Sequence, residues 1–213
     1  MKLILFGAPG VGKGTQAKIL ADKNNLFHIS TGDILREAIK NGTELGRTAK
    51  SIVDKGDLVP DNIIAGIVKE ALQSPKAKNG FILDGFPRTV DQAKILDDIF
   101  KELNINDVTL VIVDAEDSIL IERITGRRIC TVCGYILSQG TELPDNRCPS
   151  CKAENSFVKR KDDDEEVIKR RLRIYHETTK PVLDYYKGTK NSFTVDGTLP
   201  IEKVTENILA NLS

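Results

Sequence analysis

Residues 2–15 read KLILFGAPGVGKGT, in which five mostly apolar residues run directly into a glycine-rich turn. The apolar residues predict a short buried strand, and the residues after the turn predict a helix. Glycines in such a turn let consecutive backbone N–H groups point into one concavity, and the helix adds the positive end of its dipole. Lys13 can then reach the outer phosphates of a nucleotide. The stretch therefore predicts a phosphate-binding loop (P-loop) between a parallel strand and a helix.

One position of this loop departs from the usual pattern. Gly14 stands where a serine or threonine normally binds magnesium, and the hydroxyl comes one residue later, at Thr15. Asp84 ends an apolar stretch, GFILD, which is the usual place for a carboxylate that faces a nucleotide-bound metal. We therefore expect Mg2+ to be held mainly by nucleotide phosphates and water, with Asp84 acting through water. Asp33 either joins this outer shell or only begins a helix after Ser30.

Composition argues against several classes of protein. The chain has 213 residues, with 31 lysines and arginines against 31 aspartates and glutamates, so its formal net charge is zero. This balance gives no indication of a nucleic-acid or membrane partner. No apolar run approaches the roughly 18 residues of a membrane-spanning helix, and the apolar start of the chain belongs to the predicted strand. We expect a soluble, cytoplasmic protein without a signal peptide.

The rest of the chain alternates between strand and helix patterns. Apolar runs predict strands at residues 3–6, 81–83, 108–113 and 192–195. Helical patterns occupy residues 14–23, 31–40, 45–55, 61–72, 89–103, 117–124, 164–187 and 201–212. Pro181 should bend or end the helix in which it stands. Strands separated by helices predict an α/β fold with a parallel sheet that is covered by helices on both faces.

The segment from Gly126 to about Asp163 breaks this alternation and contains all four cysteines. They form two C-x-x-C pairs, separated by fourteen residues, which match a tetrahedral zinc site. A reducing cytoplasm disfavours the alternative of disulfides, and a redox dithiol needs only one pair. Iron in the same cage is the main remaining alternative. Four protein ligands leave no open position, so we expect a structural metal. The predicted ligands are Cys130, Cys133, Cys148 and Cys151.

Six motifs along the chain resemble those of adenylate kinases, specifically the long bacterial form with a zinc-binding lid. The motifs are residues 7–15 (GAPGVGKGT), 30–36 (STGDILR), 84–88 (DGFPR), 126–128 (GRR), 160–163 (RKDD) and 195–198 (VDGT). The second, third and fifth are specific to nucleoside monophosphate kinases. The resemblance implies reversible phosphoryl transfer from Mg-ATP to AMP, giving two ADP and serving adenine nucleotide homeostasis. Uridylate and cytidylate kinases share the phosphate machinery, so a UMP or CMP acceptor is the alternative.

The resemblance also divides the chain into a P-loop NTPase-type core and two mobile inserts. The core would comprise residues 1–29, 60–125 and 164–213. A small helical insert at residues 30–59 would bind AMP, and a lid at residues 126–163 would hold zinc. Both inserts would close over the substrates, because water at the transferring phosphoryl group would make the enzyme an ATPase. We expect the reopening of the inserts, rather than chemistry, to limit turnover.

Phosphoryl transfer spreads negative charge over the phosphoryl oxygens, so catalysis requires positioned cations more than a base. Arginine suits this task because its planar guanidinium makes bidentate contacts to phosphate. The resemblance assigns two arginines, Arg36 and Arg88, to the AMP phosphate. Four more would close on the ATP phosphates and the transferring group: Arg123, Arg127, Arg160 and Arg171. The predicted catalytic set is Lys13, Asp84, Arg88, Arg123, Arg160 and Arg171.

The resemblance gives each substrate a set of contacts. ATP would be bound by Gly10, Val11, Gly12, Lys13, Gly14, Thr15, Arg123, Arg127, Tyr135, Ile136 and Leu199. AMP would be bound by Thr31, Arg36, Asp57, Leu58, Val59, Gly85, Phe86, Pro87, Arg88, Gln92, Arg160 and Arg171. Asp57 departs from the pattern, since many relatives carry lysine there. Gln92 can pair with an adenine edge because its amide donates and accepts hydrogen bonds at once.

The rival from another class is a nucleotide-switched regulator that binds nucleic acid through its cysteine-bearing segment. That segment has few aromatic residues and an acidic run beside it, so we expect no nucleic-acid partner. His28 and His176 have no carboxylate or nucleophile at a recognisable catalytic spacing, and we expect no chemical role for either. An active site contained in one chain favours a monomer.

Overall fold

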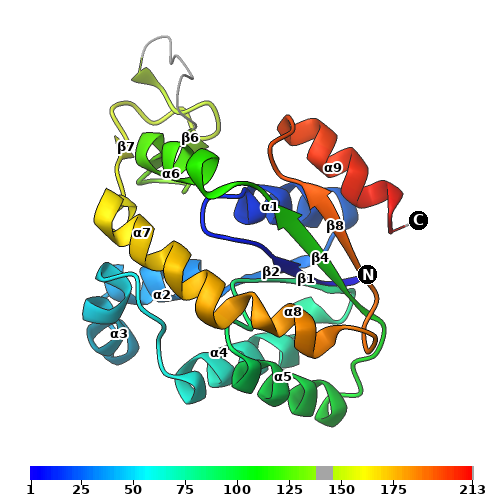
Figure 1. Ribbon diagram of the computed structural model, residues 1–213. Coiled ribbons are helices and arrows are strands. Elements are labelled where there is room, and N and C mark those ends of the chain that lie inside the picture. Colours follow the sequence, from blue (N-terminus) through cyan, green and yellow to red (C-terminus); the bar gives the residue numbers. More distant parts are fainter. Residues whose placement is uncertain (138–145, 213) are drawn as a thin grey trace.

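The computed structural model describes residues 1–137 and 146–212; residues 138–145, within the predicted lid, lie outside this description, as does residue 213. At its centre is a parallel sheet of five strands in the order β2-β3-β1-β4-β8 (Figure 1). The strands are β1 (Lys2–Phe6), β2 (Phe27–Ser30), β3 (Phe81–Asp84), β4 (Val108–Asp114) and β8 (Ser192–Asp196). The predicted α/β class is confirmed.

Helices cover both faces of the sheet. They are α1 (Lys13–Asn24), α2 (Thr31–Lys40), α3 (Glu44–Asp54), α4 (Asp61–Gln73), α5 (Val90–Glu102), α6 (Asp117–Gly126), α7 (Glu165–Ile174), α8 (Pro181–Tyr186) and α9 (Ile201–Ala210), with a 3-10 turn at Pro75–Ala77. Successive β1 side chains point to opposite faces. Leu3 and Leu5 join a core with α1, α6, α7 and α9, whereas Ile4 and Phe6 join one with α2, α3, α4, α5 and α8.

Strand β2 is the one strand of the main sheet that the sequence patterns do not predict. Its four residues, FHIS, are half polar and too few to show a clear alternation. Pairing with β3 nevertheless brings Ile29 opposite Leu83 and Ser30 opposite Asp84. Tertiary pairing therefore creates this strand, and it carries the start of α2 to the edge of the active-site region.

The helix expected over residues 164–187 is interrupted, as Pro181 predicts. A 3-10 turn at Lys161–Asp163 precedes α7, and a π-helical turn at Tyr175–Thr179 separates α7 from α8. Proline has no N–H, and its ring clashes with the carbonyl four residues earlier. The wider turn accommodates it: the Lys180 N–H donates to the Tyr175 carbonyl at 2.8 Å, and Pro181 then begins α8.

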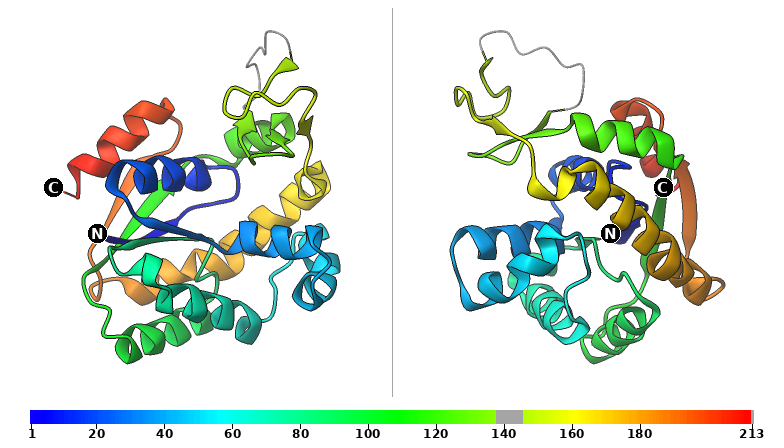
Figure 2. Two further views of the ribbon diagram at one scale, coloured as in Figure 1. Left: turned by 180° about the vertical axis from the view of Figure 1, so that it is seen from behind. Right: turned by 60° about the vertical axis from the view of Figure 1, so that its left-hand side comes forward.

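Two groups of elements project beyond the main sheet (Figures 1 and 2). Helices α2 and α3, within residues 30–59, pack against each other. A small antiparallel sheet in the order β6-β5-β7 lies within residues 126–163. Its strands are β5 (Arg128–Cys130), β6 (Ile136–Leu137) and β7 (Phe157–Val158). Helix α7 runs between the two groups (Figure 2). Among the described helices, none combines the length and apolar character needed to span a membrane.

Candidate active site

A cavity of about 880 Å³ opens at the carboxyl ends of β1 and β3, where the P-loop leads into α1. Ligands of open α/β sheets bind at this end of the strands. Residues of the core, of the 30–59 segment and of the 126–163 segment all line it. The predicted site residues among them are Gly10, Val11, Gly12, Lys13, Gly14, Thr15, Arg36, Leu58, Asp84, Gly85, Phe86, Pro87, Arg88, Arg123, Arg127, Ile136, Arg160, Arg171 and Leu199.

The P-loop backbone has a shape that glycine permits. Gly10 and Gly12 have φ values of +85° and +103°, in the region that residues with a Cβ atom avoid. Gly12 occupies the N-cap position of α1 and makes no side-chain cap, so the first N–H groups of the helix stay available. The loop and the helix therefore present free donors and a positive dipole end to the cavity, as an anion site requires.

Lys13 lies folded into this loop. Its Nζ donates to the Gly7 carbonyl at 2.6 Å and to the Ala8 carbonyl at 2.9 Å. Burial lowers the pKa of Lys13 to about 8, and the nearby carboxylate of Asp84 only partly opposes this shift. Desolvation therefore disfavours the charged ammonium while no anion is bound. A polyphosphate beside Nζ would supply the missing negative charge and return the pKa toward its usual range.

Asp84 stands at the end of β3, beside the P-loop. A Cβ atom on Gly14 would come within 3.4 Å of Asp84 Oδ2, so the carboxylate lies against the position of the missing hydroxyl. Both histidines have a carboxylate neighbour that the sequence spacing does not indicate: His176 Nε2 lies 2.9 Å from Asp117 Oδ2, and His28 Nε2 lies 3.5 Å from Asp84 Oδ2. The parallel register explains the second contact, because His28 pairs with Ile82, which shares a face of the sheet with Asp84. Recognition of β2 would have revealed it.

Six arginines line the cavity, and Arg88 and Arg160 are repelled by several of the others. Burial, followed by the charge of Arg171, lowers the pKa of Arg88 to about 10. Burial, followed by the charges of Arg36 and Arg127, lowers the pKa of Arg160 to about 10. Within the part of the chain that the structure describes, the buried Nε of Arg160 has no hydrogen-bond partner. Buried, mutually repelling guanidinium groups with an unused donor are what a polyanion would satisfy.

Acidic side chains hold three of these six arginines in place. Arg127 donates through two nitrogens to the fully buried Asp163. Arg171 donates to the Asp162 carboxylate at 2.9 Å. Two members of the acidic run at the end of the 126–163 segment, Asp162 and Asp163, thus hold arginines of the site. The remaining pair is Arg36 with Asp33 at 2.6 Å, on the exposed side of α2.

Arg88 is fixed through its own backbone and side chain. Its Nε donates to the Gly85 carbonyl at 2.7 Å. Its carbonyl accepts from the Thr179 hydroxyl at 2.9 Å, across 91 residues of sequence. Thr179 lies in the π-helical turn before Pro181, so the irregular helix serves to support a site residue. The sequence spacing gives no indication of this contact.

The larger cavity is lined by all but one of the residues predicted to surround the ATP base. Arg123 donates to the Gly197 carbonyl at 2.6 Å and to the Thr198 carbonyl at 3.2 Å, so in this structure it holds the loop that carries Leu199. Ile136 lines the cavity, but Tyr135, 37% exposed, does not. The backbone carbonyl of Tyr135 accepts from Cys130, which ties it to the cysteine turn.

A smaller cavity of about 60 Å³ adjoins the first. It contains the predicted acceptor residues that the larger cavity lacks: Thr31, Asp57, Val59 and Gln92. Gly85, with φ +87°, lies between the two, and a Cβ atom there would come within 2.9 Å of both Arg88 and Thr31. Glycine is therefore required for the close approach of the backbone to the pocket.

Asp57 is engaged outside the pocket. Its carboxylate accepts from Nε of Arg170 in α7 at 2.6 Å. This ion pair joins the 30–59 segment to α7 and accounts for an acidic residue where a lysine was expected. The side chain is thereby occupied, so a contact from residue 57 to AMP would have to come from its backbone.

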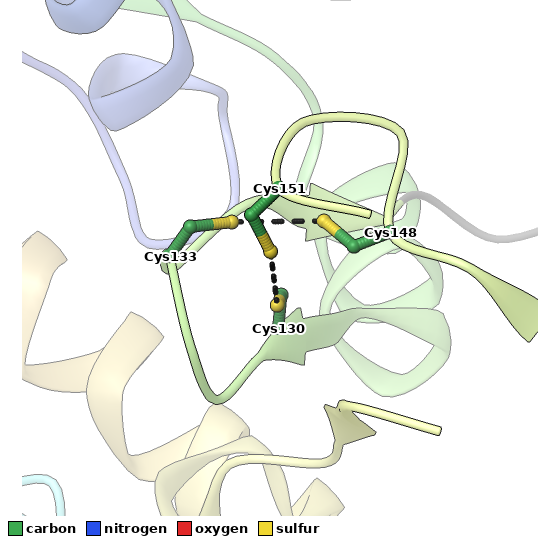
Figure 3. A group of neighbouring side chains, drawn as sticks. All are labelled: Cys130, Cys133, Cys148 and Cys151. Atoms are coloured by element: carbon green, nitrogen blue, oxygen red, sulfur yellow. Dashed lines mark hydrogen bonds between the residues drawn. The ribbon is translucent and has the colours of Figure 1, made fainter. Parts of the chain in front are cut away.

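The four cysteines form one cluster (Figure 3). Their Sγ atoms all lie within 4.8 Å of one another, with 3.6 Å between Cys130 and Cys151 and between Cys133 and Cys148. A tetrahedral ion with bonds of about 2.3 Å to sulfur requires edges of about 3.8 Å. The thiolate set and its spacing therefore fit zinc.

Both halves of this cluster use the same turn. The Gly134 N–H donates to the Cys130 carbonyl, and the Lys152 N–H donates to the Cys148 carbonyl, each at 2.9 Å. Gly134 and Lys152 both have positive φ values, of 70° and 63°. Each C-x-x-C pair therefore ends in a tight turn, with a glycine at the positive-φ position of the first turn and a lysine at that of the second.

Comparisons with known proteins agree with this geometry. A family model described as "Adenylate kinase" matches residues 5–191. Proteins named adenylate kinase from Acetivibrio thermocellus and Archaeoglobus fulgidus are 46% and 49% identical, over all of this chain and 98% of each relative. One from Chloroherpeton thalassium is 49% identical over 98% of the chain and 96% of the relative. These relatives favour adenylate over uridylate or cytidylate kinase. The chain belongs to the adenylate kinase family.

Proposed function

We propose that ATP binds in the larger cavity along the P-loop and that the base of AMP binds at the smaller one, with the phosphates of the two nucleotides meeting between them. Family membership supplies the reaction, the reversible transfer of a phosphoryl group from ATP to AMP to give two ADP. The observation that carries the placement is that the two cavities adjoin and share cationic walls. The shared residues are Gly32, Arg36, Gly56, Leu58, Gly85, Arg88 and Arg171.

The roles of the cations follow from their positions. Lys13, in the loop, would contact the outer ATP phosphates and recover its full charge there. Arg88 and Arg171 line both cavities and would therefore bridge donor and acceptor phosphates. Arg160 offers its unused Nε to the same region. Because these groups lie in a poorly solvated cavity, their attraction for the charge of the transition state is stronger than in water.

Magnesium fits the carboxylate at the end of β3. Asp84 is the acidic side chain beside the P-loop, and Gly14 provides no hydroxyl that could bind the ion directly. Mg2+ bound with ATP would neutralise phosphate charge and orient the terminal phosphoryl group. We propose that Asp84 acts on the ion through water, with His28 Nε2 3.5 Å from its carboxylate.

We propose zinc as the resident of the cysteine cluster, with a structural role. Four thiolates leave no position for substrate, and the cysteines, of which Cys130 ends β5 of the small sheet, line neither cavity. The ion would join two turns that have little apolar core between them.

Reduced cysteines and adenine nucleotide substrates fit a cytoplasmic protein, and both cavities are built from one chain, which fits a monomer.

Steady-state assays test the acceptor. ADP formation from ATP, followed by a coupled assay, should be much faster with AMP than with UMP, CMP or GMP at equal concentration. Near-equal rates with UMP or CMP would contradict the placement of a purine beside Gln92. A Gln92→Leu variant should lose preference for the AMP base while ATP binding is retained.

A further inference from the structure

Gln92 is buried at the start of α5, with 2% of its surface exposed, and its amide has two partners. Its Oε1 accepts from the Arg88 N–H at 2.7 Å. Its Nε2 donates to Asp61 Oδ1, also at 2.7 Å. The backbone N–H can only donate and the carboxylate can only accept. A rotated amide would face donor against donor and oxygen against oxygen, so these partners fix its orientation.

Asp61 acts here without touching the pocket. It is the first residue of α4, and the smaller cavity is lined by Gln92 but not by Asp61. Thr89 caps α5 and accepts from the Gln92 N–H at 3.1 Å, so the backbone of this glutamine is also fixed. The carboxylate, 31 residues away in sequence, therefore controls what the Gln92 side chain presents to the pocket.

Two bonds leave the amide with one N–H and one oxygen lone pair. A 6-aminopurine such as adenine offers a donor at N6 beside an acceptor at N1, which this pair of groups can meet in the fixed orientation. A 6-oxopurine offers an acceptor at O6 beside a donor at N1, which requires the amide to be rotated. Rotation would break both bonds and place its oxygen against the Asp61 carboxylate.

We infer that Asp61 is a positioning residue for base specificity: it fixes the Gln92 amide so that the acceptor site takes 6-aminopurine and rejects 6-oxopurine monophosphates. This inference rests on the proposed placement of AMP in the smaller cavity. Arg88, already placed at the phosphate, contributes to the same selectivity through its backbone N–H. Specificity and phosphate binding are thus linked at one residue.

The test compares AMP with inosine monophosphate (IMP), which differs from it only at the two relevant positions of the base. In Asp61→Asn, the new amide can face Gln92 with either an oxygen or an N–H group, so rotation of Gln92 becomes easier. We expect the ratio of kcat/KM for AMP to that for IMP to fall about tenfold, the size expected for one hydrogen bond to a charged group. The KM for ATP should not change.

A matched control separates this role from helix stability. Asp91 is also an acidic residue in the first turn of a helix, but it is exposed and pairs with Lys94. Asp91→Asn should leave the AMP to IMP ratio unchanged. Combining Asp61→Asn with Gln92→Leu should give the ratio of Gln92→Leu alone, because Asp61 acts through the amide.

The outcomes separate the inference from the proposed function. An unchanged ratio in Asp61→Asn, with a changed ratio in Gln92→Leu, overturns the role of Asp61 and leaves the placement of AMP intact. A double variant whose ratio lies below that of Gln92→Leu alone also overturns it, because the effect of Asp61→Asn would then not require the Gln92 amide. If Gln92→Leu itself leaves the ratio unchanged, the base lies elsewhere and both proposals are wrong.

Discussion

Replacement of Arg88 by alanine tests the proposed role of the shared cationic wall. Arg88 lines both cavities, and its Nε is already bonded to the Gly85 carbonyl. Its terminal nitrogens are therefore the donors left for phosphate. The pKa of this guanidinium, lowered to about 10 by burial and by Arg171, keeps it charged at neutral pH. Arg88 is thus a desolvated cation at the place where the phosphoryl group is predicted to pass from ATP to AMP.

The expected loss can be estimated from comparable arginines. An arginine that stabilises a transferring phosphoryl group raises kcat by a factor of about 10³ to 10⁵. Because Lys13 and Arg171 remain, we expect Arg88→Ala to lose kcat/KM at the lower end, about 10³, which corresponds to about 4 kcal/mol. Arg88→Lys should recover part of this loss, since it keeps the charge but not the planar pair of donors.

The assay is ADP formation from ATP and AMP, with thermal unfolding followed by circular dichroism. Arg88 is half-buried and repelled by Arg171 and Arg36, so its removal relieves repulsion and should not lower the melting temperature. The matched control is Arg128→Ala, since Arg128 is exposed and bonds to the backbone carbonyls of Thr125 and Arg127. It should keep nearly full activity. Activity of Arg88→Ala within tenfold of the wild type would refute the reasoning.

Three further results are expected. ATP binding at pH 8.5 should be accompanied by uptake of most of one proton, because the phosphates raise the pKa of Lys13, which is about 8 in the free protein. Calorimetry in buffers of different ionisation enthalpy should detect this uptake in the wild type and not in Lys13→Met. Zinc removal, or Cys130→Ser, should lower the melting temperature, whereas the control variant Val132→Ser, at an exposed position, should not. An unchanged melting temperature after verified metal loss would contradict a structural role for the ion. Added viscogen should lower kcat if reopening of the inserts limits turnover, and a viscosity-independent kcat would count against it.

Lys13 has a second consequence for stability. Its pKa in the folded protein lies below that of the unfolded chain, so between about pH 8 and 10.5 the unfolded state binds more protons. The contribution of Lys13 to the free energy of unfolding therefore rises with pH through this window. The same contribution is unfavourable below pH 8, where the buried ammonium must stay charged. Comparison of wild type with Lys13→Met in urea, at pH 7 and pH 9.5, measures this difference.

Local patterns were sufficient for most of the fold. The P-loop, four strands of the main sheet and the interruption at Pro181 depend on apolar runs, glycine and proline, whose effects act over a few residues. β2 could not be predicted, because its half-polar sequence becomes a strand only through pairing with β3. The cysteine cluster followed from spacing, since two C-x-x-C turns can meet in few ways.

The site shows a similar division. Every residue predicted to contact a nucleotide lines at least one of the two cavities, except Tyr135. The supporting contacts were not predictable: Asp61 on Gln92, Thr179 on Arg88 and His28 near Asp84 join residues 31 to 91 positions apart. No local periodicity records such pairs, because only the folded chain brings them together. Asp57 needed the structure too, since its partner lies in another helix.

The central claim is that two nucleotides bind end to end between the P-loop and Arg88. The most direct test is a crystal structure with a bisubstrate mimic, two adenosines joined by a chain of phosphates. We predict one adenosine in the larger cavity, the other beside Gln92, and the phosphates between Lys13 and Arg88. A mimic that failed to bind, or that placed both adenosines away from these residues, would contradict the account.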